Sequence, residues 1–378
     1  MKSTYDVIIV GTGAMGSATA AELSRRGRKV LCFDRFEPPH NLGSSHGLTR
    51  IIREAYYESP KYVPIIQKAY ENWEKLERDT GESLYLRTGG LMIGPGESQL
   101  LKGALLSAQL HHLPHEILDS RQIRERFPAF HPDSDDIGIW EPRAGILFPE
   151  KCIEANLRLA SKHGATFHFN ETVTDWEASN GSITVNSSRG IYHADRLLLT
   201  AGAWLDQLLA GLKISLKVER QVLYWFGAKS NTRYFQPENF PIFIWSYDHD
   251  RIFYGFPDLG SGIKFAKHYE GVPAHPDTIN RVVGNEEIES MKALIRRWIP
   301  DAEGQLLSTS VCMYTNTPNL HFHISPHPLH ERVLVASICS GHGFKFASAF
   351  GEILSDILEN KKPAFDLSLF GFPGLLPK

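Results

Sequence analysis

Cysteine is scarce in this sequence, and its few copies are scattered. The 378 residues include four cysteines, Cys32, Cys152, Cys312 and Cys339, and no two of them form a C-x-x-C pair. This pattern argues against a disulfide framework and against a zinc ribbon, so we expect no metal site. Cys32 and Cys339 stand inside apolar runs, where a free cysteine most simply serves as a small core residue.

Long apolar runs and a surplus of one charge are missing as well. The sequence has no stretch of 18 or more apolar residues, so we expect no membrane span. Its first strand pattern begins almost at once, without the apolar region of a secretory signal, which favours a cytoplasmic protein. A formal net charge of −3 offers no footprint for nucleic acid. A hydrophobic content of 42% and the chain length fit a globular protein of about two domains.

The most informative stretch that is present lies at the N-terminus. Apolar residues 7–10 predict a buried strand, and Gly11, Gly13 and Gly16 follow it at the spacing G-x-G-x-x-G. A helix pattern and a second strand come next, and that strand ends in Asp34. Strand, glycine turn, helix and distal acid together distinguish a dinucleotide-binding motif from an ordinary glycine turn.

Each part of the motif has a physical reason. Gly11 allows the tight turn, Gly13 lets the backbone approach a pyrophosphate, and Gly16 lets the helix pack against the sheet. The helix that begins at Ala14 offers unpaired N–H groups and a partial positive charge to the phosphates. The Asp34 carboxylate can accept hydrogen bonds from ribose hydroxyls.

The rest of the chain predicts an α/β protein, with a Rossmann-like dinucleotide-binding domain and an inserted antiparallel-sheet (α+β) domain. Alternating polar and apolar segments recur between 214 and 316 and predict the inserted sheet, interrupted by one helix. Residues 116–150 carry four prolines and are expected to form connections and short strands. We predict a cofactor-binding domain over 1–87, 149–217 and 318–378, and a substrate domain over 88–148 and 218–317.

Three basic residues stand out in these segments. Arg50 and Arg53 follow an irregular loop, and a helical turn would place them on one face, where their donors suit a carboxylate or phosphate. Their spacing alone slightly favours a solvated charged turn, whereas the neighbouring Ile51, Ile52 and His46 indicate a partly buried segment. Lys345 stands in the first turn of a predicted helix, where the helix dipole disfavours a cation, so its position calls for an anion or a function.

Two strand patterns carry further candidate side chains. In the strand 263–268, a period of two puts Lys264 and His268 on one face. They would point into a cavity if Ile263 and Phe265 pack into the core, although spacing alone favours solvent. In the strand near 309–315, the same period puts Cys312 and Tyr314 on one face. A cysteine in a strand is more often a core residue, although this pair could equally line a cofactor cavity.

Longer motifs accompany these residues. They are Gly11-Thr-Gly-Ala-Met-Gly16, Pro38-Pro-His40, Gly43-Ser-Ser-His-Gly-Leu-Thr-Arg-Ile-Ile-Arg53, Tyr254-Gly-Phe-Pro257, Cys312-Met-Tyr-Thr315 and Ser340-Gly-His-Gly-Phe-Lys-Phe346. With them the sequence resembles, over essentially its whole length, the monomeric sarcosine oxidase and N-methyltryptophan oxidase family of flavoproteins. The resemblance implies FAD-dependent oxidation of the C–N bond of a secondary (N-methyl) amino acid such as sarcosine. Oxygen would be reduced to hydrogen peroxide, and the imine would hydrolyse to an aldehyde and an amine.

The resemblance also implies roles for individual residues. Cys312 would hold the flavin covalently, and Lys264 would assist the reduction of oxygen. The residues beside the flavin ring would be His46 and Arg50, which form the catalytic set together with Lys264 and His268. The substrate carboxylate would be gripped by Arg53 and Lys345, and the amine pocket would be lined by Tyr254, His268 and Tyr314. The remaining implied cofactor contacts are Gly11, Gly13, Ala14, Met15, Gly16, Asp34, Arg35, Ser44, Gly341, Gly343, Phe344 and Lys345.

A few positions depart from the family pattern or divide it. Leu48 replaces an acid, Lys267 is closer to the N-methyltryptophan type, and Arg220-Gln-Val222 looks like the sarcosine type. A fructosyl amino acid is a further candidate substrate, with Trp245 and Tyr247 as candidate determinants of pocket size. Other hypotheses are an electron-transferring flavin dehydrogenase, a non-catalytic flavin subunit and an NAD-linked dehydrogenase. We expect a monomer that acts on a small carboxylated amine and on molecular oxygen.

Overall fold

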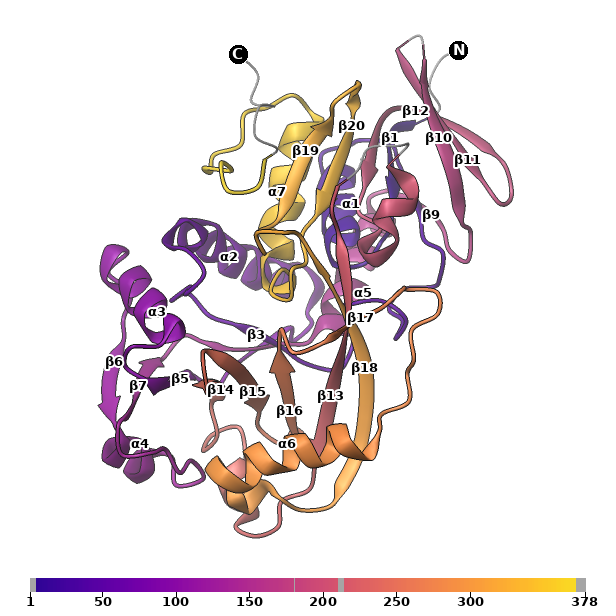
Figure 1. Cartoon of the computed structure of the whole chain (residues 1–378). Helices are drawn as coiled ribbons and strands as arrows, with labels where there is room; N and C mark the ends of the chain where they lie inside the picture. Colours follow the sequence, from indigo (N-terminus) through magenta and orange to yellow (C-terminus); the bar gives the residue numbers. More distant parts are fainter. Residues whose placement is uncertain (1–4, 180, 210–213, 372–378) are drawn as a thin grey trace.

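The first sheet is built around the apolar N-terminal strand. The structure, a computed structural model, describes residues 5–179, 181–209 and 214–371 (Figure 1). Strand β1 (Tyr5–Val10) pairs in parallel with β2 (Val30–Phe33) on one side and with β12 (Ile191–Leu199) on the other. Strand β20 (His330–Ser337) pairs in parallel with the end of β12. The sheet is completed by β9 (Thr166–His168), β10 (Val173–Ser179), β11 (Ser182–Ser187) and β19 (His323–His327).

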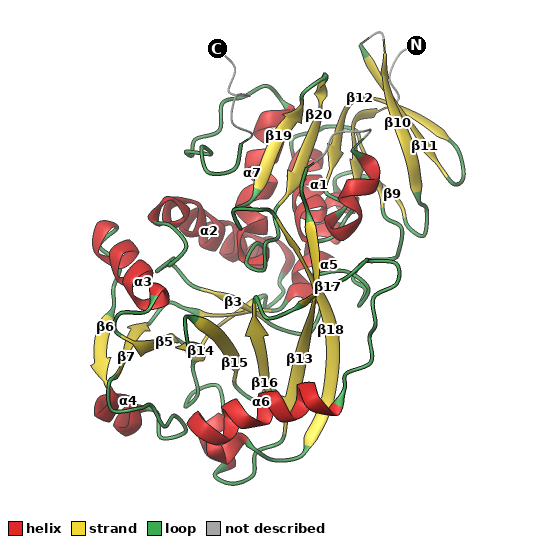
Figure 2. Ribbon diagram, viewed as in Figure 1, coloured by secondary structure: helices red, strands yellow, loops and turns green. Residues whose placement is uncertain are grey.

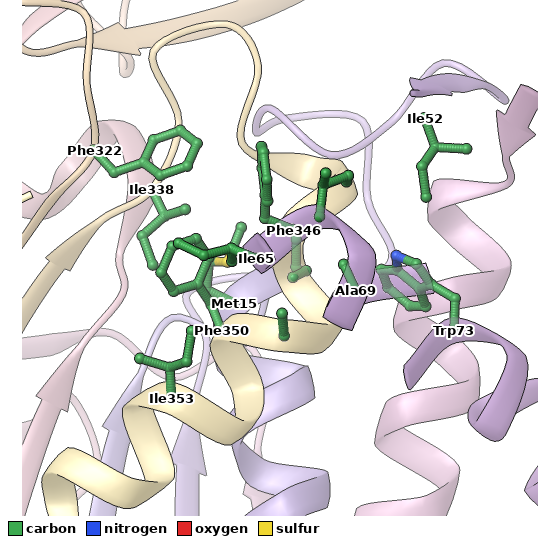
Figure 3. Packing of buried hydrophobic residues seen from close by; sticks show 14 of the residues in the cluster. Met15, Ile52, Ile65, Ala69, Trp73, Phe322, Ile338, Phe346, Phe350 and Ile353 are labelled. Carbon is green, nitrogen blue, oxygen red and sulfur yellow. The ribbon is translucent and has the colours of Figure 1, made fainter. Parts of the chain in front are cut away.

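Helices pack together beside this sheet. Helix α1 (Ala14–Arg25) contacts both α5 (Pro149–Lys162) and α7 (Ala347–Leu358), and α2 (Val63–Thr80) packs on α7. Figure 3 shows Phe346 and Phe350 gathered beside Met15 and Ile65. Burial of each such side chain contributes about 1.5–3 kcal/mol. This packing fixes the glycine turn, which leads into α1, and the segment that precedes α7.

The second sheet takes its strands from two separate stretches of the chain. In order they are β17 (Val272–Pro273), β13 (Lys217–Phe226), β16 (Ile263–His268), β15 (Arg251–Phe256), β14 (Ile242–Tyr247), β5 (Gly90–Pro95), β7 (Asp136–Glu141) and β6 (Glu116–Asp119), with β18 (Leu306–Asn316) also paired to β13. Neighbouring strands are antiparallel except β5 and β14, which run parallel. Helix α6 (Asn285–Trp298) lies across this sheet (Figure 2) and buries Met291, Ile295 and Trp298 in its aromatic core.

A third, short sheet joins segments close to the predicted substrate site. It pairs β8 (Gly145–Leu147) with β3 (Arg50–Ile52) and with β4 (Tyr85–Arg87). The other described helices are α3 (Gln99–Leu110), α4 (Ser120–Arg126) and the 3-10 turns η1 (Pro60–Tyr62), η2 (Gly202–Leu208), η3 (Thr232–Phe235), η4 (Pro300–Ala302) and η5 (Phe344–Phe346). None of the described helices is long and apolar enough to cross a membrane.

The predicted fold class is confirmed: a Rossmann-like sheet is combined with an inserted sheet domain. The inserted sheet is mixed rather than purely antiparallel, because β5 and β14 run parallel. Helix α4 lies within a segment predicted to have connections and strands, where Asp119 and Gln122 form a capping box at its start. Arg50 begins a strand, so it shares no helical turn with Arg53. Lys345 lies in η5, because α7 begins only at Ala347.

Candidate active site

A large cavity is lined by residues of both main sheets. It extends from Gly11 and Asp34, which follow β1 and β2, to Tyr254 and Cys312 on the second sheet. Most of the predicted site residues also line it: Gly13, Ala14, Met15, Arg35, Ser44, Arg50, Arg53, His268, Tyr314, Gly341, Gly343, Phe344 and Lys345. Three predicted residues of the described chain are buried without lining it: Gly16, His46 and Lys264.

The glycine turn has the geometry that its motif requires. Gly11 has a φ of +95°, and a Cβ on it would lie 2.5 Å from the carbonyl oxygen of Thr200. A Cβ on Gly13 would meet no atom of the described chain within 4 Å, so the backbone there faces open space in the cavity. A Cβ on Gly16 would lie 1.9 Å from the carbonyl oxygen of Gly11. Gly11 and Gly16 are therefore required by packing, and Gly13 leaves room for a ligand.

Asp34 ties the glycine turn to the end of β2. Its Oδ2 accepts hydrogen bonds from the backbone N–H of Thr12 at 2.8 Å and from the Thr12 hydroxyl at 3.1 Å. Its Oδ1 accepts the N–H of Phe36 at 3.0 Å. Asp34 therefore fixes the turn as well as facing the cavity. The next residue, Arg35, lies at the exposed edge, in an ion pair of 2.6 Å with Asp277.

Cys312 lies on β18 at the opposite wall of the cavity. It is 3% exposed, and its Sγ is 3.7 Å from Nη2 of Arg50. The same nitrogen donates to the carbonyl oxygen of Ser44 at 2.7 Å. The sequence left open whether Cys312 is a core residue or lines a cofactor cavity. In the structure it is both buried and part of the cavity wall. Cys339 was expected in the core, but it is only half-buried and lines the same cavity.

Two cations meet around the ring of Tyr56. The Arg53 guanidinium carbon lies 4.5 Å from the ring centroid, and the Lys345 Nζ lies 5.3 Å from it. Arg53 is 3% exposed, so the prediction of a solvated charged turn is wrong. Its Nη2 pairs with Oε2 of Glu58 at 3.0 Å. Burial, followed by the charge of Arg53, lowers the pKa of Lys345 to about 7. Lys345 Nζ donates to the carbonyl oxygen of His342 at 2.8 Å.

Lys264 is buried, although its strand pattern favoured solvent. Its side chain is on β16, and Nζ donates to the carbonyl oxygens of Gly47 at 2.6 Å and Thr49 at 3.1 Å. A third hydrogen bond, of 2.9 Å, goes to the Thr49 hydroxyl. Burial and then the charge of Arg50 lower the pKa of Lys264 well below its usual value. The loop that covers Lys264 lies 215 to 217 positions earlier in the sequence, so the strand pattern could not reveal that Lys264 is buried.

Two histidines of the predicted set are held neutral. Burial lowers the pKa of His268 to about 3, and its Nδ1 lies 3.1 Å from the Tyr314 hydroxyl. Burial and then the charge of Arg50 lower the pKa of His46 to about 3. The Nε2 atom of His46 is buried without a hydrogen-bond partner in the described part of the chain. His268 can therefore orient a substrate through hydrogen bonds, and His46 has one unused polar atom.

Three carboxylates that support the site were not predicted from the sequence. Glu58 pairs with Arg53. Glu141 accepts the backbone N–H groups that follow Arg53, and Glu150 accepts those of the loop beside Lys264. They lie in turns or at the ends of elements, with no motif of their own. Conversely, the prediction that Trp245 and Tyr247 determine pocket size is wrong, because both pack with Phe253 and Trp298 in the aromatic core.

Comparison with known proteins agrees with this geometry. A family model described as FAD dependent oxidoreductase matches residues 6–357. The chain belongs to this family. It is 43% identical to monomeric sarcosine oxidase of Streptomyces avermitilis over 376 residues, which cover 98% of this chain and 97% of that relative. It is 35% identical to N-methyl-L-tryptophan oxidase of Yersinia pestis over 368 residues, which cover 97% and 98%. The family resemblance of the sequence is thereby confirmed.

The fold of this FAD-dependent oxidoreductase is also found among solved structures. NikD, an unusual amino acid oxidase essential for nikkomycin biosynthesis, superposes with a TM-score of 0.86 at 23% identity, over 100% of both chains. The cavity fits FAD on grounds of its own. Gly13 leaves its backbone open beside a helix N-terminus, and the Cys312 thiol lines the same cavity from the second sheet.

Proposed function

We propose that this FAD-dependent oxidoreductase oxidises the C–N bond of a secondary amino acid such as sarcosine. One molecule of oxygen accepts two electrons and two protons and leaves as hydrogen peroxide, and water hydrolyses the imine to an aldehyde and a demethylated amine. The observation that carries the proposal is the pair of buried cations, Arg53 and Lys345, in the same cavity as the glycine turn and Cys312. A buried cation pair beside open space is suited to a small anionic substrate.

The cavity would hold FAD along its full length. The glycine turn and the N-terminus of α1 would bind the pyrophosphate, and Asp34 the ribose. Cys312 would hold the other end through a thioether, with the Arg50 guanidinium beside its sulfur atom. Held there, FAD would supply the redox chemistry, which is acceptance of a hydride equivalent from the carbon next to the amine nitrogen and transfer of the two electrons to oxygen.

The chain's own residues would orient the substrate. Arg53 and Lys345 bind the carboxylate, so the amine and its N-methyl carbon are fixed relative to the cavity wall. The Tyr254, His268 and Tyr314 side chains surround the amine, and the neutral imidazole can accept a hydrogen bond from it without adding a competing charge. The buried Lys264 ammonium would stabilise negative charge as oxygen is reduced.

Related functions differ in substrate or in electron acceptor. N-methyltryptophan or a fructosyl amino acid would need the same carboxylate clamp, so these substrates remain alternatives. A dehydrogenase that uses a protein or quinone acceptor would not need Lys264, and a non-catalytic flavin subunit would need neither cation. We also propose a monomer, as in the name of the Streptomyces relative.

The division into domains is part of the proposal. Segments 1–87, 149–217 and 318–378 would form the cofactor domain, because all the described strands of the first sheet fall in them. The strands of the second sheet fall in 88–148 and 218–317, apart from the first residue of β13. The outer ends of the first assignment, residues 1–4 and 372–378, lie outside the described residues.

A peroxide-release screen tests the function. The purified holoenzyme is offered sarcosine, N-methyltryptophan, other N-methyl amino acids, proline and a fructosyl amino acid in air, with a peroxide-coupled dye. We expect peroxide with sarcosine or another N-methyl amino acid. Peroxide with the fructosyl compound alone would favour that alternative. Turnover with an artificial electron acceptor but none with oxygen would contradict the oxidase assignment.

A further inference from the structure

The position of Lys264 depends on one short loop. Its Nζ donates to two oxygens of Thr49 and to the carbonyl oxygen of Gly47. An ammonium group has three protons, so these acceptors match all of them. The aliphatic part of the side chain brings Nζ to 4.8 Å from the ring centroid of Phe256 and 5.4 Å from that of Trp225. The loop 47–49 therefore determines where this charge lies.

Glu150 holds the same loop from another side. It lies in the first turn of α5, and its Oε1 accepts the backbone N–H of Gly47 at 2.7 Å and that of Leu48 at 3.1 Å. The carboxylate of Glu150 thus binds the N–H groups of the loop while the ammonium of Lys264 binds its carbonyl groups. The two side chains are joined through three consecutive residues.

The backbone of the loop shows why it needs support. The φ angles are +97° at Gly47 and +70° at Leu48, in the left-handed region that a leucine rarely adopts. The Leu48 side chain is 48% exposed, so its packing contributes little to holding this conformation. A Cβ on Gly47 would lie 2.5 Å from Cδ1 of Leu223, which requires glycine there. The hydrogen bonds to Glu150 hold the N–H groups of this strained segment, and those from Lys264 and Arg50 hold its carbonyl groups.

Glu150 also supplies negative charge to a region rich in cations. The titratable or charged groups that act on Lys264 are Arg50, Cys312, Glu150 and His46. Burial and then Arg50 lower the pKa of Lys264, whereas Cys312 and, after it, the Glu150 carboxylate act in the opposite direction. His46 is neutral near pH 7 because burial and then Arg50 lower its pKa to about 3. Glu150 is the carboxylate among these four groups, and its negative charge favours the protonated form of Lys264.

We propose that Glu150 is a positioning residue for the reaction with oxygen. It fixes the loop 47–49 so that Lys264 is held as an ammonium where oxygen is reduced. Glu150 itself neither gives nor takes a proton or an electron, and the two electrons still come from the reduced holoenzyme. This inference rests on the proposed oxidase function. A purely structural role, in which an acid at a helix N-terminus stabilises α5, predicts a loss of stability alone.

Rapid mixing separates the two halves of the reaction. The holoenzyme is reduced anaerobically with sarcosine in one experiment, and in another it is reduced with dithionite and mixed with oxygen. We expect Glu150→Ala to lower the rate constant for oxygen by about 10–100-fold, the loss expected for charge-assisted hydrogen bonds. Reduction by sarcosine should stay within about twofold of wild type, because the clamp of Arg53 and Lys345 is untouched. Glu154→Gln, an exposed site on the same helix, is the matched control.

Two further variants distinguish positioning from stability. In a Lys264→Met background, Glu150→Ala should cause little further loss of the oxygen rate, because both changes remove the same effect. Glu150→Gln keeps an acceptor oxygen but no charge. The variant should therefore react with oxygen at nearly the wild-type rate at low pH. As the pH is raised, its rate should begin to decline at a lower pH than that of wild type, because Lys264 loses its proton more easily.

The outcome that overturns the inference is specific. If Glu150→Ala reacts with oxygen within about twofold of wild type, Glu150 does not position Lys264. The inference would also be overturned if Glu150→Ala lowered the oxygen rate equally in the wild-type and Lys264→Met backgrounds, because independent effects add. Should sarcosine and the other amines fail to reduce wild-type enzyme, the proposed function would be wrong. The dithionite-reduced enzyme would still report whether Glu150 acts on the oxygen reaction.

Discussion

Arg53 and Glu58 form a buried ion pair at the cavity wall, with 3.0 Å between Nη2 and Oε2. A substrate carboxylate must therefore compete with Glu58 for the same guanidinium. Glu58→Gln would remove this competitor and leave Arg53 without its counter-charge. We expect a simple carboxylate such as butyrate to bind about 10-fold more tightly, as measured by calorimetric titration.

The same change should destabilise the enzyme without ligand. Removal of one partner from a buried ion pair costs about 3–5 kcal/mol, because the remaining charge stays buried. Butyrate should then raise the unfolding temperature of Glu58→Gln more than that of wild type. Equal or weaker binding by the variant would show that Glu58 does not compete for Arg53.

Lys345 should make carboxylate binding dependent on pH. Burial and then the charge of Arg53 lower its pKa to about 7, so the ammonium is present below pH 7 and is lost as the pH rises through it. Butyrate carries no amine, and its affinity should fall by up to about tenfold per pH unit above pH 7. Lys345→Met should bind more weakly at pH 6 and show a flat profile. A wild-type profile that is flat from pH 6 to 9 would contradict the assigned role.

Particular elements show how much of the fold can be predicted from the sequence. The apolar run of β1 and the glycine turn are local signals, and they predict β1, α1 and β2. The prolines of 116–150 predict connections and short strands, yet proline is favoured at the first position of a helix, and α5 begins at Pro149. The sequence pattern therefore places Glu150 outside any helix and gives no sign of its contact with the loop 47–49.

Most of the residues that the sequence predicts for the site lie together in the structure, but their environments could not be predicted. The family motifs point to Cys312, Arg53 and Lys345, and the structure brings all three to one cavity. A period of two cannot tell whether the outer face of β16 is covered, so the spacing alone favours solvent for Lys264, which is in fact buried. For β14 both faces are buried, and Trp245 belongs to the core rather than to the pocket. Such coverage depends on segments far apart in the sequence.

The glycines of the turn should respond differently to alanine. In Gly16→Ala, the new Cβ would lie 1.9 Å from a backbone oxygen, so we expect a loss of about 1–3 kcal/mol or more of stability. In Gly13→Ala, the Cβ would enter open space, so the unfolding temperature of the cofactor-free protein should be unchanged. Its FAD content should nevertheless fall, as measured by the ratio of flavin absorbance to protein. Full FAD content in Gly13→Ala would show that the phosphates bind elsewhere.

Cys312 should carry the covalent bond to the flavin. A thiolate is a far better nucleophile than a serine hydroxyl, so Cys312→Ser should lose the yellow colour when the protein is precipitated with acid. Wild-type protein should keep it. Cys339→Ser is the matched control, because its thiol lies in the same cavity. Retention of colour by Cys312→Ser, with loss by Cys339→Ser, would move the link to the other cysteine.

Glu141 should be needed for carboxylate binding, although it lies outside the clamp. It is 1% exposed and accepts the N–H of Glu54 at 2.6 Å and that of Ala55 at 2.9 Å, directly after Arg53. In Glu141→Gln, the amide group can accept only one of these hydrogen bonds, so a buried N–H is left unpaired. We expect a loss of about 1–3 kcal/mol of stability and about 10-fold weaker butyrate binding.

Glu77→Gln provides the control for this prediction, because Glu77 accepts two backbone N–H groups, from Leu84 at 2.7 Å and Tyr85 at 3.0 Å. It should lower stability and leave butyrate affinity unchanged.

The pH dependence of unfolding gives a second measurement. Burial raises the pKa of Glu141 to about 7 from 4.5, so the folded state binds its proton more tightly than the unfolded chain. This group therefore makes the free energy of unfolding fall as the pH rises from 4.5 to about 7, and Glu141→Gln should lack that fall. Unchanged butyrate affinity in Glu141→Gln would show that Arg53 is held without it.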